Sequence, residues 1–155
     1  MGWLSHIYEA EYIFPDDAQA DAIRAAIVEA LESTPRYAHI TAEAELQHLF
    51  QRHGDQHSVR HAYHDHEVAN AELTVYVSLR RLVMWLQGTH STKVFKFVDD
   101  LAFTFATVDG KTVVHTLSIS RIGQGDMFQN RKNISIIMDT VNARMPYERV
   151  VVLQK

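Results

Sequence analysis

Cysteine is absent from the 155-residue chain, and proline and glycine are scarce, with 3 and 6 residues. Without cysteine the protein can form no disulfide, no thiolate metal site and no cysteine nucleophile. The chain also lacks an excess of basic residues. Its formal net charge of −4 argues against a general nucleic-acid surface, which would need a basic patch.

Long hydrophobic runs are missing as well. The most apolar window, residues 73–86, is too short to span a bilayer and has Arg80 and Arg81 in its middle. No lysine or arginine precedes Arg24, so we expect no secretory signal peptide. With 46% apolar and 22% charged residues, the chain has the composition of one globular domain, 1–155, which we expect to be cytoplasmic and without a transmembrane segment.

Two segments have the apolar spacing of amphipathic helices. Residues 17–33 follow Asp16, a good N-cap residue, and Gln19 three positions later completes a capping box. Residues 127–142 follow Asp126, and Gln129 three positions later completes a second capping box. The sequences EAEYIF, near the start, and ERVVVLQ, near the end, have the composition of strands.

Residues 93–120 predict strands that surround the turn VDG. A three-residue loop with Gly110 in the left-handed position would pair Phe103 with His115, and all large apolar side chains would share one face. A two-residue turn would instead pair a phenylalanine with Thr116. The apolar match favours the three-residue loop.

Polar residues gather at the end of this hairpin that is far from the turn. By strand alternation, Asp99 and Arg121 fall on the face with the buried apolar side chains, and Asp100 lies beside them on the opposite face. The second helix begins a few residues after Arg121, which brings Asn130 and Arg131 to the same corner.

Two interpretations of this corner stay open. An ion pair between Asp99 and Arg121 would lock the strand to the helix, since a buried charge needs a partner. Alternatively, Arg121, Arg131 and helix N–H groups bind an anion, with Asp99 as its orienting group or a general base. We prefer the structural interpretation, because structural ion pairs mimic active sites.

The candidate residues follow from these two interpretations. An enzyme would use Asp99 and Arg121 for catalysis. His115 faces the same surface and is more typical of a satisfied core histidine than of a catalyst. The candidate ligand-binding residues are Asp99, Asp100, His115, Arg121, Asp126, Asn130 and Arg131.

Histidines are concentrated before the middle of the chain. On a helix over residues 56–70, His57, His61 and His64 would share one side, and this spacing can chelate a divalent transition metal. The alternatives are a solvated polar face that binds metals adventitiously and a pH-responsive surface.

The sequences FVDDLAF and VVHTLSISRIGQGDMFQNRKN resemble the bacterial and plastid family catalogued as domain of unknown function 1499. Ala102 replaces an acid of the family pattern, and Gly125 replaces a serine. The resemblance implies a fold and a set of residues, and no reaction. The matching residues, spaced as in the family over 97–132, are Phe97, Asp99, Asp100, Phe103, Ser118, Ser120, Arg121, Gly123, Asp126, Asn130 and Arg131.

A weaker similarity to the same family covers TPRYAHITAEAELQHLF. It implies a strand at 45–51, where periodicity alone leaves helix and strand open. Residues 53–92 would then be an insertion between two strands that normally follow each other closely. The apolar residues 73–87, whose secondary structure stays open, would bury their surface in a homodimer.

The sequence therefore predicts an α+β fold, an antiparallel sheet with helices 17–33 and 127–142 packed on one face and an inserted, histidine-rich, partly helical segment. We expect a binding domain for a small anionic or amphipathic ligand at the polar corner. The alternatives are an enzyme that performs acid–base chemistry, with a metal on the histidines, and a structural interaction protein. A pocket beside Arg121 favours the first two, and a dry corner favours the third.

Overall fold

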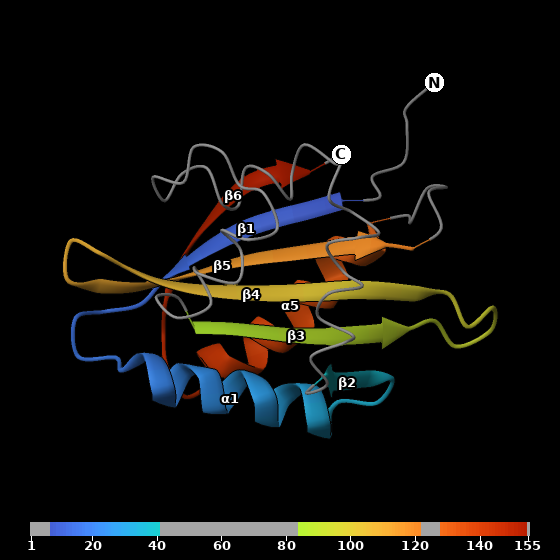
Figure 1. Ribbon diagram of the computed structural model, residues 1–155, viewed down its shortest axis with the longest axis horizontal. Coiled ribbons are helices and arrows are strands. Elements are labelled where there is room, and N and C mark those ends of the chain that lie inside the picture. Colours follow the sequence, from blue (N-terminus) through green and yellow to red (C-terminus); the bar gives the residue numbers. More distant parts are fainter. Residues whose placement is uncertain (1–6, 41–83, 122–127, 155) are drawn as a thin grey trace, which may run out of the picture.

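The computed structural model describes residues 7–40, 84–121 and 128–154. Six strands form one antiparallel sheet in the order β2-β3-β4-β5-β1-β6, which confirms the predicted α+β class (Figure 1). The elements are β1 (Ile7–Ile13), α1 (Ala20–Ser33), β2 (Tyr37–Ile40), β3 (Met84–Ser91), β4 (Val98–Val108), β5 (Lys111–Ser120), α5 (Gln129–Asn142) and β6 (Glu148–Gln154).

Both helices pack on the same face of the sheet. In Figure 1, α5 runs behind the middle strands and α1 lies along the side of β3 and β2. The apolar stripes predicted from helical spacing are the buried ones, because they meet every second side chain of the strands. The helix residues in this core include Ile23, Ile27, Leu31, Ile134, Ile137, Met138 and Val141, and the strand residues include Tyr8, Ala10, Tyr12, Leu86, Leu101, Phe103, Phe105 and Val114.

Close packing of α1 on β3 depends on Gly88. A Cβ atom at this position would lie 2.8 Å from Cδ2 of Leu31 and 3.0 Å from the carbonyl oxygen of Ala38. Any larger residue would therefore force the Leu31 side chain or the edge strand β2 to move away from β3.

Both helices begin later than the sequence predicts. The N-cap of α1 is Gln19 rather than Asp16, because Ala18 N–H donates to the Pro15 carbonyl at 3.0 Å and holds the preceding residues in a turn. Phe128, in the left-handed conformation with φ 66°, is the N-cap of α5. Asp126, the predicted N-cap, lies outside the described residues.

The three-residue loop predicted for the β4–β5 hairpin is wrong. Val108 pairs with Lys111, which leaves a two-residue turn in which Asp109 and Gly110 both have positive φ, as a type I′ turn requires. The register therefore moves by one residue, and Phe103 pairs with Thr116. A one-residue shift exchanges the faces of every side chain on β5 relative to β4.

Residues 84–91 of the predicted insertion form β3, an inner strand of the sheet between β2 and β4. Leu86, which we placed at a dimer interface, is buried in the core. Residues 45–52, the histidine segment at 53–66 and residues 73–83 lie outside the described residues, so the insertion and the dimer stay predictions. No helix within the described residues combines the length and the hydrophobicity needed to cross a bilayer.

Candidate functional site

Polar side chains occupy both faces of the sheet at the end where the β4–β5 hairpin is open. The register pairs Asp99 with Ser120 and Asp100 with Ile119. Asp99 faces the helices, and Asp100 faces the other way. The predicted polar corner is therefore two separate groups of residues, one on each face.

On the helix face, a buried corner cluster surrounds Asp99. We define the corner cluster by its members, which are His90, Asp99, Ser118, Ser120, Asn130 and Asn133. The Asp99 carboxylate accepts hydrogen bonds from Asn133 Nδ2 at 2.7 Å and from Ser120 Oγ at 2.8 Å. His90 Nδ1 lies 3.1 Å from Asp99 Oδ2, and it is the donor because an ionised carboxylate only accepts.

Asparagine side chains connect the strands to the start of α5. Ser118 Oγ donates to Asn130 Oδ1 at 2.6 Å, and Asn130 Nδ2 donates to Ser120 Oγ at 3.0 Å. Gln129, expected to close a capping box, instead donates from Nε2 to Asn133 Oδ1 at 2.6 Å. These bonds fix the first turn of α5 against β4 and β5.

Tyr37 lies at the border of the corner cluster. Its ring and that of His90 have centroids 4.8 Å apart. Burial raises the pKa of Tyr37 to about 12, and the negative charge of Asp99 adds to the increase, while Arg36 opposes it. Tyr37 therefore stays neutral over the physiological range and can donate to Asn133 Oδ1, which lies 3.5 Å away.

The corner cluster resembles acid–base machinery only in composition. A histidine beside an aspartate can move protons when one of them reaches a substrate. Here the side chains of His90 and Asp99 are 3% and 4% exposed, and both oxygens of the carboxylate already accept hydrogen bonds. The geometry is that of a satisfied structural network.

The face opposite the helices carries the second polar group. We define the second face by its buried residues, which are Glu9, Gln87, Asp100, Ala102, Thr104, Val113, His115, Leu117 and Ile119. Arg121 binds Asp100 in a bidentate arrangement, with Nη2–Oδ1 at 2.9 Å and Nε at 3.2 Å from each oxygen. The predicted pairing of Arg121 with Asp99 is therefore wrong, because the hairpin register places them on opposite faces.

A second buried pair lies one strand further along this face. His115 Nε2 is 3.2 Å from Glu9 Oε2, and both side chains are almost completely buried. His115 was expected to face Phe103. It pairs with Thr104 instead, which places it on the opposite side of the sheet.

Three polar atoms of the second face lack partners. Among the described residues, Oε1 of Glu9 and both Oε1 and Nε2 of Gln87 are buried and make no hydrogen bond. The strand registers place Gln87 opposite Ala102, Ala102 opposite Leu117 and Leu117 opposite Glu9, so the four form one row across the sheet.

Sequence reasoning missed Glu9 and Gln87. Glu9 alternates with apolar residues, as a solvent-facing residue of a half-buried strand would. The only available signal for Gln87 was its place in the apolar sequence LVMWLQG.

The remaining predicted residues are Arg131 and the three histidines of the metal site. Arg131 is exposed on α5. The predicted metal ligands His57, His61 and His64 lie outside the described residues. Within the described residues, no three histidine, aspartate or glutamate side chains come together as a metal site would require.

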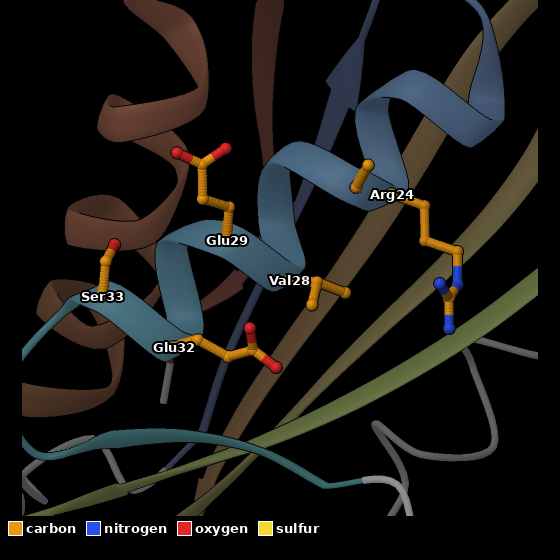
Figure 2. A pocket seen from close by; sticks show the side chains of 6 residues that line it. Arg24, Val28, Glu29, Glu32 and Ser33 are labelled. Atoms are coloured by element: carbon orange, nitrogen blue, oxygen red, sulfur yellow. The ribbon is translucent and has the colours of Figure 1, made fainter.

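A surface pocket of about 540 Å³ lies along α1 (Figure 2). Its described lining comes from this helix alone, and none of the lining polar side chains is buried. Glu29 is bound by Arg144 at 2.6 and 2.8 Å, a hydrogen-bonded pair that lowers the pKa of the carboxyl group. We therefore do not assign the ligand site to this pocket. The lining residues are Arg24, Ala25, Val28, Glu29, Glu32 and Ser33.

Comparison with protein families finds a matching family model. The family model DUF1499, described as a protein of unknown function, matches residues 8–141. The chain belongs to the DUF1499 family. Neither the curated proteins nor the solved structures contain a match to the chain.

The DUF1499 sequence pattern has a structural explanation in this chain. Of the residues that carried the resemblance, Asp99, Ser118, Ser120 and Asn130 belong to the corner cluster. Asp100 and Arg121 form the ion pair on the second face. Of the two positions where the chain departs from the pattern, Ala102 lies on the second face between Gln87 and Leu117, and Gly125 lies outside the described residues.

Proposed function

We propose that this DUF1499 domain binds a small amphipathic molecule on the second face of its sheet. The observation that carries the proposal is the set of buried, unpaired polar atoms of Glu9 and Gln87. Leaving a buried donor or acceptor unsatisfied costs about 1–3 kcal/mol per group. A ligand that supplied the missing partners would recover this energy on binding.

The arrangement of the row indicates the chemistry of the ligand. Strands are about 4.8 Å apart, so Gln87 and Glu9 are separated by roughly 14 Å across three spacings. Ala102 and Leu117 lie between them and offer an apolar middle. A hydroxyl or amino group would donate to the free oxygen of Glu9, and a group with both donor and acceptor would satisfy the carboxamide of Gln87.

Charge favours an amphipathic ligand over a strongly anionic one. Asp100 lies against Arg121 and balances its charge, and Glu9 adds a further acidic group to the same face. The corner cluster has a supporting role in this proposal. It holds the ends of β4 and β5 to α5, and so it fixes the positions of the strands that present the ligand-binding residues.

The test combines ligand binding with stability. Saturation-transfer NMR with a library of hydroxylated and amino-bearing amphipathic compounds should find binders to the wild type. Glu9→Gln and Gln87→Leu should each reduce the affinity for these compounds at least about tenfold, the equivalent of one lost hydrogen bond. Glu32→Gln, the same change as Glu9→Gln on exposed α1, is the matched control.

The stability measurement separates a ligand site from a structural role. Gln87→Leu should raise the free energy of unfolding without ligand by about 1 kcal/mol, because it removes unpaired polar atoms. A structural glutamine would give the opposite sign. The proposal fails if no compound binds the wild type, or if both variants bind the compounds as tightly as the wild type does.

A further inference from the structure

The loop between β3 and β4 exposes large apolar side chains. Val94 is 75% exposed, Phe95 is 74% exposed and Phe97 is 45% exposed. The rings of Phe95 and Phe97 stack on one another with centroids 5.4 Å apart, so they shield each other without entering the core. Figure 1 shows this loop projecting beyond the strand ends, at the end of the sheet away from the β4–β5 turn.

Basic residues alternate with these apolar residues. Lys93 and Lys96 are exposed in the same loop, and neither forms an ion pair within the described part of the chain. The start of α5 lies at the same end of the sheet and adds exposed Arg131 and Lys132, together with Phe128 at 58% exposure.

The acidic residues at this end of the sheet do not offset the positive charge of these basic residues. Asp99 and Asp100 are both buried and bound to partners, and the exposed Glu32 near the end of α1 is offset by the exposed Arg36. The opposite end of the sheet is acidic on balance, in agreement with the net charge of −4 of the whole chain. Its exposed charged residues near the β4–β5 turn are Asp16, Asp17, Asp109 and Glu148, against Lys111 and Arg149.

We propose that this end of the molecule is a docking surface for an anionic lipid bilayer. Val94 and Phe95 would insert at the boundary between headgroups and acyl chains, where aromatic rings are favoured. Lys93 and Lys96 would reach back to the lipid phosphates along their flexible stems. The charge difference between the two ends would orient the protein as it approaches the membrane.

A bilayer suits the loop better than a protein partner does. Stable protein interfaces bury about 800 Å² on each side and have few lysines at their centre. This loop offers a narrow projection with two lysines among its apolar residues. Lipid headgroups accept both kinds of side chain without a complementary surface.

Flotation with vesicles tests the proposal directly. The wild-type chain should bind vesicles of phosphatidylcholine with one-third phosphatidylserine, and should bind pure phosphatidylcholine at least about tenfold less, because each lysine adds about fivefold on an anionic surface. High salt should remove most of this difference.

Two loop variants separate the apolar and electrostatic contributions. Val94→Ser with Phe95→Ser, and Lys93→Gln with Lys96→Gln, should each reduce binding at least about tenfold. Val108→Ser with Lys111→Gln makes similar changes at the opposite end and should bind like the wild type. Circular dichroism and a urea transition would check that all variants fold.

Three outcomes would overturn the proposal. The first is equal binding to neutral and anionic vesicles, and the second is full binding by both loop variants. The third is no vesicle binding together with a mass in light scattering that falls to the monomer value when Phe95 is replaced, since that would assign the surface to self-association.

Discussion

Replacing Asp99 by alanine should remove the acceptor on which the corner cluster converges. The change leaves three donors, on His90, Ser120 and Asn133, without their partner in a buried site. An unsatisfied buried donor costs about 1–3 kcal/mol, and water entering the space left by the carboxylate would recover part of it. We therefore expect a loss of about 3–4 kcal/mol in the free energy of unfolding.

Urea denaturation followed by circular dichroism measures this loss. With an m value of roughly 2 kcal/mol/M, the midpoint should fall by nearly 2 M. Asp139→Ala is the matched control, because Asp139 is exposed on α5. Its effect should stay within about 0.5 kcal/mol.

A double-mutant cycle identifies the partner of Asp99. Asp99→Ala and Asn133→Ala should be coupled by more than about 1 kcal/mol, because the two side chains share a hydrogen bond of 2.7 Å. Asp99→Ala and Arg121→Ala should be nearly additive, since the residues lie on opposite faces. A midpoint unchanged by Asp99→Ala, or stronger coupling to Arg121 than to Asn133, would refute the reasoning.

Two further predictions concern packing and pH. Gly88→Ala should destabilise the fold by about 1–3 kcal/mol, since its Cβ would lie 2.8 Å from Leu31, and an unchanged urea midpoint would contradict this contact. Burial raises the pKa of Tyr37 from 10.0 to about 12, so the unfolded tyrosine ionises first and stability falls as the pH rises between these values. Tyr37→Phe should lose less stability over this window, and a pH profile identical to the wild type would exclude the effect.

The helices show how far apolar periodicity carries a prediction. Ile23, Ile27 and Leu31, and Ile134 and Ile137, form stripes that only a helix can bury together. The helix starts were not predictable in the same way. Asp16 and Gln19 fit a capping box, but Ala18 N–H donates to the Pro15 carbonyl and forms a turn there. The helix therefore begins after Gln19 instead of after Asp16.

The hairpin register shows why the candidate site was placed on one face. If only one face of the sheet is buried, all large apolar residues of the hairpin should share that face. Leu117 and Ile119 are buried on the second face instead, together with His115. Alternation cannot choose a register when both faces are buried, and the sequence of the turn then decides. The correct turn separates Arg121 from Asp99.

The position of β1 has a consequence for synthesis of the chain. Of the described strands, β1 is made before the others, yet Glu9 pairs with Leu117 of β5 and Leu153 of β6. While the chain grows on the ribosome, Tyr8 and Tyr12 have no sheet to join until β5 has left the exit tunnel. Contacts so distant in sequence form slowly and leave apolar surface open to aggregation. Among the described strands, β6 pairs only with β1, so the last of these strands to be made forms the sheet edge by pairing with the first.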